Sequence, residues 1–365
     1  TGTSLLAARD AGCNALGIEV NPFLCFASRV KTHNWHYAPL KAQAAKIVAD
    51  ARVRLDKACV DDLIDDSKLP DMPRRERWIA RKVACKVVTL RECITGNTTE
   101  AARPFFLLAL AAILRGASNM KLSPHAFGSR EVKQDAPVLA MFEAKLDKML
   151  ADVRYAEQEG RLAGREVYVK QGDIRDPGDL DRTLLPAQLA VCSPPYLNNL
   201  DYTMQTRLEL FFLGFVANMD ALKALRKQMM ICDAKATYRD VEDWRLVEHV
   251  HSVTEIAEQI DEKLEDKGWG WDYGRMTRQY FGGLLRSMQS IHDMVAPGAT
   301  LVMILGESAH AGVLVPVPDI TAELGEIAGF TQPEVRELRT RRSSSHKIAL
   351  KESAVVLRRV VDRRS

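Results

Sequence analysis

The residues with the most specific chemistry are four consecutive ones, Ser193, Pro194, Pro195 and Tyr196, which follow the apolar stretch 189–192. Each proline fixes its φ angle and lacks an N–H donor, so the segment is predicted to be a rigid, extended turn that exposes carbonyl oxygens at a strand end. The Ser193 hydroxyl oxygen and the Pro194 carbonyl could accept both hydrogens of one amino group and turn its nitrogen toward an electrophile. Tyr196 would stack on the ring that carries the amino group. The segment therefore suits an aromatic amine as substrate, and the alternative is a proline-rich strand exit with a packed tyrosine.

A second pattern with chemical meaning opens the chain. Thr1–Thr3 is typical of the end of a glycine turn, 4–10 of the start of a helix, and 15–20 of a short apolar strand that carries Glu19 near its end. A turn, helix and strand followed by an acid make up most of the βαβ pattern that holds a nucleoside, in which backbone N–H groups approach the ligand and the acid accepts from the ribose hydroxyls. Asp173 follows another short strand in the same way. The alternative is a glycine turn that only links packed elements.

Together these residues resemble the S-adenosylmethionine-dependent amino-methyltransferases of DNA. Thr1–Thr3 resembles the tail of that family's donor motif, Asp-Pro-Phe-x-Gly-x-Gly-Thr, and 193–196 resembles its catalytic tetrapeptide, which is Asp, Asn or Ser followed by Pro-Pro-Tyr. The resemblance covers residues 1–28 and roughly 165–360. It implies S-adenosylmethionine as cofactor, with Glu19 on the ribose and Asp173 on the adenine amino group. The implied cofactor residues are Gly2, Thr3, Glu19, Asp173 and Cys192, and the implied catalytic residues are Ser193, Pro194, Pro195 and Tyr196.

The resemblance also implies a reaction. The target nitrogen attacks the sulfonium methyl directly, with no metal, on a base flipped out of duplex DNA. The Ser form of the tetrapeptide is closest to the N4-cytosine branch, so N4 of cytosine is the expected target and N6 of adenine the alternative. Methylation of RNA or of a protein amide, or a binding module without turnover, are the remaining interpretations. A covalent route through Cys192 is disfavoured, because a nucleophilic thiolate needs an activating neighbour.

The surrounding pattern predicts an α/β fold, a Rossmann-like methyltransferase with a mostly parallel sheet, an antiparallel edge hairpin and a helical insertion. Residues 1–28 are expected to start the methyltransferase domain, 29–160 to form the helical insertion and a DNA-recognition region, and 161–365 to complete the domain. The predicted helices are 41–57, 77–93, 99–115, 136–159, 206–230, 281–295 and 319–328, and the predicted later strands are 189–192, 299–305, 334–338 and 354–357.

Two features depart from the family pattern. The first strand and first glycines of the donor motif do not precede Thr1. We therefore expect residues upstream of Thr1 in the gene, with a short apolar strand and an Asp-Pro-Phe-like turn. The helical insertion between the second and third strands also differs from the family's usual placements of the target-recognition region, so no recognition residue is transferred.

Two basic segments are candidates for DNA contact. Arg74, Arg75, Arg77 and Arg81 surround Trp78 in the insertion, and the segment KGWGWDYGRMTRQY is predicted to be a glycine-broken loop rich in aromatics and arginine. Such residues could contact phosphates or fill the space left by a flipped base, while the alternative is that the tryptophans are core and the arginines solvated. The DNA-binding candidates are Arg77, Trp269, Trp271, Arg275 and Arg278.

Composition bounds these expectations. With 365 residues, 47% hydrophobic and 27% charged, the chain matches an ordinary globular protein, and its net charge of +3 neither requires nor excludes DNA. Seven cysteines without a CxxC pair predict reduced thiols, and no apolar run reaches a membrane-spanning length. The sequence thus predicts a cytoplasmic protein without a membrane partner. Its expected partners are duplex DNA and a cognate restriction system, and nothing in the sequence indicates an oligomeric state.

Overall fold

The computed structural model describes residues 1–56, 65–122, 126–128, 133–160, 165–180, 182–198, 200–234, 240–265, 272–342 and 348–360. These residues form two compact units. Unit 1 comprises Thr1–Gln171 and Tyr202–Leu225, and unit 2 comprises Gly172–Asp201 and Arg226–Ser365.

Unit 1 contains a pair of short strands, and the first of them ends at the acid predicted from the sequence, Glu19. β1 (Ala15–Glu19) pairs in parallel with β4 (Val167–Gln171), and Glu19 lies opposite Gln171. Helix α1 (Thr3–Asp10) packs on β1 so closely that a Cβ on Gly17 would come within 2.8 Å of Leu5. Helix α2 (Pro22–Thr32) starts at a proline, and the Asn21 side chain accepts from two backbone N–H groups of its first turn. The turn, helix, strand and acid expected at the start of the chain are therefore confirmed.

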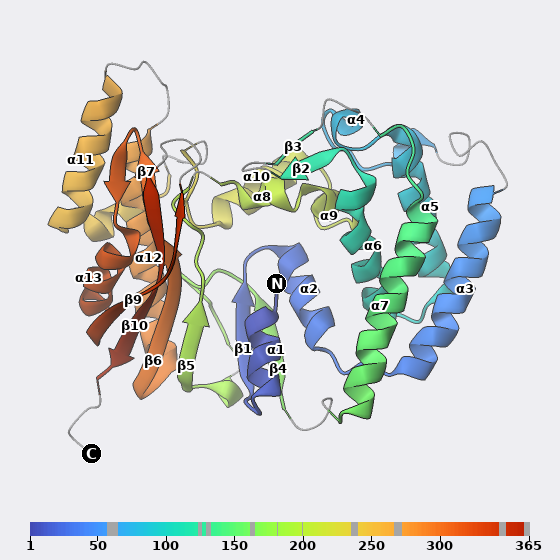
Figure 1. Ribbon diagram of the computed structural model, residues 1–365, viewed down its shortest axis with the longest axis horizontal. Coiled ribbons are helices and arrows are strands. Elements are labelled where there is room, and N and C mark those ends of the chain that lie inside the picture. The colour runs from blue at the N-terminus through green and yellow to red at the C-terminus, as the bar shows by residue number, and fades with distance from the viewer. Residues whose placement is uncertain are drawn as a thin grey trace. The chain divides into compact units, whose positions relative to one another are not determined.

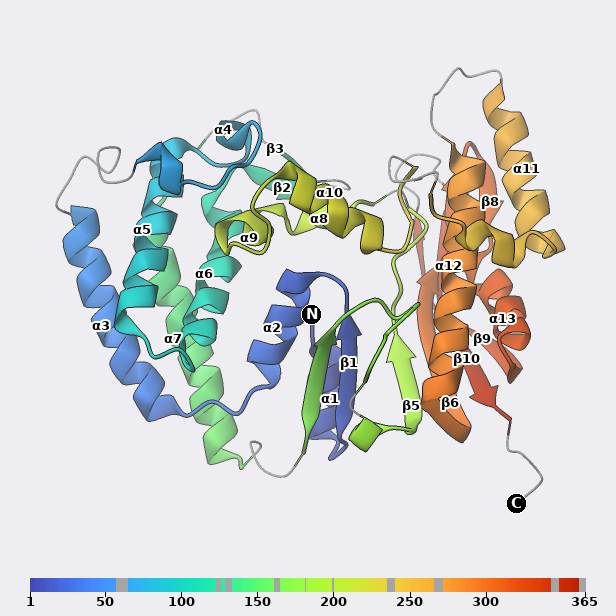
Figure 2. The ribbon, with the colours of Figure 1, turned by 180° about the vertical axis from the view of Figure 1, so that it is seen from behind.

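The remainder of unit 1 is mostly helical, and its four long helices, 37–56, 81–97, 103–117 and 138–158, lie side by side (Figures 1 and 2). Apolar residues at three- and four-residue spacing bury one face of each long helix, as in Phe106, Leu110 and Leu114. The predicted helix 77–93 is in fact two helices, since the chain is extended at Ile79 and Ala80. The helices are α3 (Tyr37–Asp56), α4 (Arg75–Trp78), α5 (Arg81–Asn97), α6 (Arg103–Ala117), α7 (Val138–Gln158), α8 (Tyr202–Gln205) and α9 (Arg207–Phe212), and α10 (Met219–Gln228) crosses the unit boundary. Between α6 and α7 in the chain, β2 (Met120–Leu122) and β3 (Ala126–Gly128) pair in antiparallel orientation.

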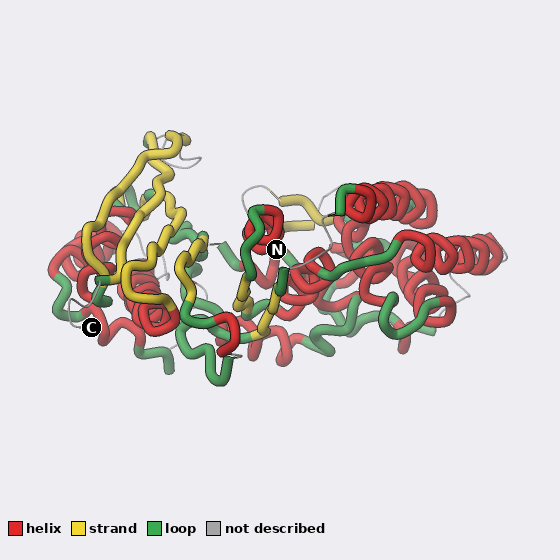
Figure 3. The backbone as a smooth tube through the Cα atoms, turned by 90° about the horizontal axis from the view of Figure 1, so that it is seen from below, coloured by secondary structure: helices red, strands yellow, loops and turns green. Residues whose placement is uncertain are grey.

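Unit 2 contains a four-stranded sheet in the order β5-β6-β10-β9. β5 (Ala187–Cys192) and β6 (Val295–Gly306) are parallel, whereas β10 (Ala349–Arg359) is antiparallel to both β6 and β9 (Phe330–Arg342). Helices α12 (Tyr273–Met294) and α13 (Val317–Ile327) lie on one face of this sheet (Figures 2 and 3). Unit 2 also contains α11 (His251–Glu265), β7 (Ser308–His310) and β8 (Val313–Val315).

The α/β class and the antiparallel edge hairpin are confirmed. The four-stranded sheet is mixed, with one parallel and two antiparallel strand pairs. The more specific expectation of a mostly parallel, Rossmann-like sheet is therefore not confirmed and stays a prediction. The single helix predicted over 206–230 is wrong, because the chain turns at Gly214, where φ is 78°, between α9 and α10. The described helices include none long and apolar enough to cross a membrane.

Another prediction is corrected near the start of α12. The segment 267–280 was expected to be a loop, but it is helical from Tyr273 onward. The Asp272 carboxylate accepts from the backbone N–H of Arg275 and caps the helix, and Tyr280 is fully buried. Arg275 and Arg278 therefore lie on a helix. The predicted contacts of Trp269 and Trp271 fall outside the described residues.

Candidate functional site

The tetrapeptide lies at the carboxyl end of a parallel strand. β5 ends at Cys192, which pairs with Met303 of β6, and the four following residues belong to no helix or strand. Ser193 is exposed, while the two prolines and Tyr196 are partly buried. The sequence prediction of a non-regular turn at a strand end is thus confirmed. The exposed serine hydroxyl is accessible to a ligand, as an acceptor for an amino group must be.

Tyr196 is held in a close contact at the end of β6. A Cβ on Gly306 would lie 3.3 Å from the tyrosine ring and 3.2 Å from Nη2 of Arg341, so a side chain at this position would require one of them to shift by a few tenths of an ångström. Burial raises the pKa of the Tyr196 phenol, partly opposed by a hydrogen bond with the Ser193 side chain. The phenol is therefore neutral at physiological pH.

Arg341 is a neighbour of the tetrapeptide that the sequence analysis did not select. Its Nη2 donates to the carbonyl of Glu307 at 3.1 Å, and its buried Nε has no hydrogen-bond partner among the described residues. The signal for it was the basic segment RTRRSSSHK. The location of Arg341 beside Tyr196 depends on the pairing of β9 with β10 and could not be predicted from the sequence.

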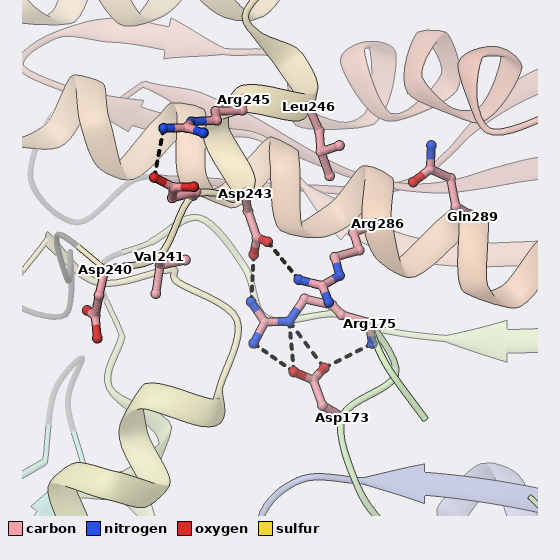
Figure 4. Close-up of a pocket in the computed structure, with 10 residues that line it drawn as sticks. Asp173, Arg175, Asp240, Val241, Asp243, Arg245, Leu246, Arg286 and Gln289 are labelled. Atoms are coloured by element: carbon pink, nitrogen blue, oxygen red, sulfur yellow. Dashed lines mark hydrogen bonds and ion pairs between the residues drawn. The ribbon is translucent and has the colours of Figure 1, made fainter. Parts of the chain in front are cut away.

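Asp173 belongs to a network of two acids and two arginines (Figure 4). Its carboxylate accepts from Nε and Nη2 of Arg175 at 2.9 and 2.7 Å and from the Arg175 backbone N–H at 2.9 Å. Nη1 of Arg175 contacts Asp243 at 2.7 Å, and Arg286 contacts the same acid at 3.3 Å. Burial disfavours the charged form of Arg175, but the hydrogen bonds and charges of the two acids outweigh it, so its pKa is raised. The network fixes the orientation of the Asp173 carboxylate.

A cavity of about 610 Å³ borders this network. Asp173, Arg175 and Arg286 line it together with the apolar side chains of Val241 and Leu246 (Figure 4). Its volume falls in the range of about 300–1,000 Å³ that is typical of small-molecule sites. Asp173 and Arg286 are the members of the network with access to a ligand, because 29% and 46% of their side chains are exposed, against 8% for Arg175 and 7% for Asp243.

Gly2, Thr3 and Glu19 lie in unit 1. Gly2 has a φ of 78° and begins α1, and a Cβ there would lie 3.0 Å from Cα of Ser28, so the turn leaves no room for a side chain. Burial raises the pKa of the Glu19 carboxyl. Two interactions oppose this shift: the hydrogen bond that the carboxylate accepts from the Asn21 backbone N–H at 2.9 Å, and the positive charge of the Thr1 amino group. The structure thus combines a tight glycine turn and a half-buried acid within one unit, and it places Asp173 and 192–196 in the other.

Cys192 has the character of an inert thiol. Burial raises its pKa to about 12, so the thiolate is scarce at neutral pH. A covalent mechanism through Cys192 is therefore disfavoured by its environment, in agreement with the expectation from the sequence.

The basic candidates differ in exposure. Arg77 on α4 is exposed, while Trp78 beside it is buried and carries the Arg207 guanidinium 5.1 Å from its ring centroid. Trp78 is accordingly a core residue. Arg278 is partly buried and pairs with Asp261 at 3.2 Å, which neutralises part of its charge. Among these residues, Arg77 has the surface position most suited to a phosphate.

Comparison with known proteins gives several relatives. The chain is 25% identical over 191 residues to the type II methyltransferase M.BsoBI of Geobacillus stearothermophilus, covering 47% of this chain and 36% of that protein. It is 26% identical to the type II methyltransferase M.AvaI of Nostoc sp. over 42% of this chain and 33% of that protein, and 22% identical to the type II methyltransferase M.MvaI of Kocuria varians over 54% and 44%. The matches thus span less than half the length of these relatives. No family model and no solved structure matches the chain.

These relatives share one class. Across about half of its length the chain is similar to type II methyltransferases, the class that the tetrapeptide and the glycine turn indicated. This similarity supports the methyltransferase resemblance in general.

Proposed function

We propose that the protein transfers a methyl group from S-adenosylmethionine to the exocyclic amino nitrogen of a base in duplex DNA, with N4 of cytosine as the target atom. The observation that carries this proposal is the tetrapeptide 193–196 at the carboxyl end of β5, with an exposed serine hydroxyl and a neutral tyrosine ring. The similarity to type II methyltransferases supports it.

The residues present suit the proposed cofactor. The glycine turn at Gly2, which a Cβ would fill, lets backbone N–H groups approach a ligand, and Glu19 and Asp173 provide acceptors for ribose hydroxyls and for an adenine amino group. The cavity beside Asp173 has the volume of a small-molecule site. S-Adenosylmethionine, when bound, supplies an electrophilic methyl group. We include Thr3 and Cys192 among the residues beside it.

In the proposed mechanism the protein positions the nucleophile. An aromatic amino group is a weak nucleophile because its lone pair is delocalised into the ring. Hydrogen bonds to the Ser193 hydroxyl and the Pro194 carbonyl favour a pyramidal nitrogen with its lone pair directed at the methyl group. Pro195 keeps the turn extended, and stacking on Tyr196 offsets part of the cost of flipping the base, which is about a few kcal/mol.

The proposal extends to architecture and partners. We assign the fold as a Rossmann-like methyltransferase domain formed by 1–28 and 161–365, and the helical region 29–160 as the part that recognises DNA, with a cognate restriction system as biological partner. Arg77, Arg275 and Arg278 are the described candidates for phosphate contacts.

The test is transfer of a labelled methyl group by the full-length protein. Duplex DNA, RNA and peptides that contain asparagine and glutamine are offered separately, and we expect label in the duplex DNA. Label in RNA or in a peptide would replace DNA as the substrate class. Tight donor binding without transfer to any of the three would instead support a binding module. Ser193→Ala and Tyr196→Ala serve as the matched variants that should lose transfer.

A further inference from the structure

The backbone directly after the tetrapeptide is fixed by two buried side chains of β7. The carbonyl oxygen of Leu197 accepts a hydrogen bond from the Ser308 hydroxyl and another from Nε2 of His310, the second at 3.0 Å. Ser308 is 5% exposed and His310 6%, while the Leu197 side chain is fully buried. Two side chains more than a hundred residues away in sequence thus converge on one carbonyl, one residue beyond Tyr196.

The donor role of His310 follows from its partners. In the tautomer that forms this hydrogen bond, Nε2 of His310 carries the hydrogen, because a carbonyl oxygen can only accept, and the same nitrogen lies 3.3 Å from the Ser308 hydroxyl. The imidazole ring stacks on the Tyr273 ring with centroids 5.1 Å apart and an interplanar angle of 29°, which fixes the plane in which that hydrogen points. Tyr273 belongs to the aromatic segment selected from the sequence as a DNA contact, and its ring here supports the histidine.

The position of this contact gives it a consequence for Tyr196. Pro194 and Pro195 have no N–H groups, so the turn has few backbone donors with which to anchor itself. Its described backbone hydrogen bond runs from the Asn198 N–H to the Tyr196 carbonyl, at 2.7 Å. The two side-chain donors on Leu197 therefore hold the backbone at the end of a segment that has few backbone hydrogen bonds of its own.

We propose that Ser308 and His310 are positioning residues, which hold the Leu197 carbonyl so that Tyr196 and the tetrapeptide keep the geometry needed for methyl transfer. This proposal rests on the proposed function. It predicts that loss of either hydrogen-bond donor slows the chemical step. Binding of S-adenosylmethionine should be unchanged, because neither Ser308 nor His310 lies among the residues assigned to the cofactor. A displacement of about 1 Å is enough to cost roughly a hundredfold in rate.

The experiment compares three variants with two controls. His310→Phe keeps a ring against Tyr273 and removes the donor, His310→Gln restores an N–H group near the position of Nε2, and Ser308→Ala removes the hydroxyl. The controls are Ser287→Ala, a buried serine that donates within α12, and His292→Phe, a histidine packed on Phe330.

Single-turnover methyl transfer, calorimetric donor binding and the melting temperature are measured for each variant. We expect His310→Phe and Ser308→Ala to slow transfer about 10- to 100-fold with the donor Kd changed less than about threefold, and His310→Gln to recover most of the rate. Equal rates in His310→Phe and His292→Phe, or a His310→Gln variant as slow as His310→Phe, would overturn the proposal.

Hydrogen exchange gives a readout that does not require activity. The amide of Asn198 should exchange at least about tenfold faster in His310→Phe and Ser308→Ala than in the parent and the two controls, because the turn loses its anchor. Unchanged exchange would contradict the positioning role even if the parent transfers no methyl group. If the parent protein transfers no methyl group but the Asn198 amide exchanges faster in the variants as expected, the proposed function is rejected. The role of Ser308 and His310 in holding the Leu197 carbonyl is then supported without it.

Discussion

Arg175 holds the carboxylate of Asp173 through two side-chain nitrogens, at 2.9 and 2.7 Å, and its third nitrogen reaches the buried carboxylate of Asp243 at 2.7 Å. The arginine thus ties an acid proposed to bind the cofactor to an acid in the interior of unit 2. Asp243 is 7% exposed, and Arg175 and Arg286 are its ion-pair partners among the described residues.

Replacing this arginine should destabilise the protein. Arg175→Ala leaves Asp243 with only the longer contact to Arg286 among the ion pairs described here, and breaking a buried pair from one side costs about 3–5 kcal/mol. Arg286→Ala removes a half-exposed partner of the same acid and should cost less than about 1 kcal/mol. Urea unfolding of both variants measures the difference. Equal losses of unfolding free energy would show that Arg175 has no special role in the network.

The two acids should govern cofactor affinity. Glu19→Ala and Asp173→Ala should each weaken S-adenosylmethionine binding by about 1–3 kcal/mol. In each variant a hydroxyl or amino group of the ligand is removed from water and loses the carboxylate that accepted its hydrogen bond. Because burial raises the pKa of Glu19, acidification should begin to weaken binding above the ordinary range of a glutamate, and Glu19→Gln should remove that part of the pH dependence. Calorimetry across pH is the measurement. Parent-like affinity in both alanine variants would reject these assignments.

Gly306 should be intolerant of a side chain. Gly306→Ala introduces a Cβ 3.3 Å from the Tyr196 ring and 3.2 Å from Arg341, and one of them must move by a few tenths of an ångström. We expect methyl transfer to slow about 3- to 10-fold with a nearly unchanged donor Kd. Gly96→Ala is the control, because a Cβ there meets nothing within 4 Å. Parent-like transfer by Gly306→Ala would show that the position of the Tyr196 ring is not critical.

The exposed arginine on α4 should contribute to DNA affinity through phosphate. Arg77→Ala should flatten the slope of log affinity against log salt concentration by roughly 0.9. Arg278→Ala should flatten it less, because Asp261 already neutralises part of that charge. Fluorescence anisotropy on duplex DNA over a range of salt measures both slopes. A slope unaltered by Arg77→Ala would assign this arginine to a solvated face.

The sequence was informative where the signal is local. The tetrapeptide at the end of β5, the acid at the end of β1 and the hairpin of β9 and β10 all follow from short patterns of proline, apolar alternation and charge. The start of α12 was missed because the aromatic and glycine content of its first turn outweighed the capping signal of Asp272.

Contacts between distant segments could not be predicted in this way. Arg175 and Asp243 are 68 positions apart in the sequence, and Leu197 and His310 are 113 positions apart. A periodic pattern in the sequence cannot indicate contacts between such distant residues. The same holds for Arg341, which the β9–β10 pairing brings to Tyr196. In each case the residue type was visible in the sequence and its partner was not.

The most direct test of the proposed function is mass spectrometry of nucleosides from the DNA of cells that express the full-length gene. We predict N4-methylcytosine, reduced at least about a hundredfold by Ser193→Ala or Tyr196→Ala, because both remove contacts to the reacting amino group or its ring. N6-methyladenine in its place would contradict the assigned target base. DNA without either methylated nucleoside, from cells that contain the folded protein, would contradict the proposal that this protein methylates amino groups of DNA.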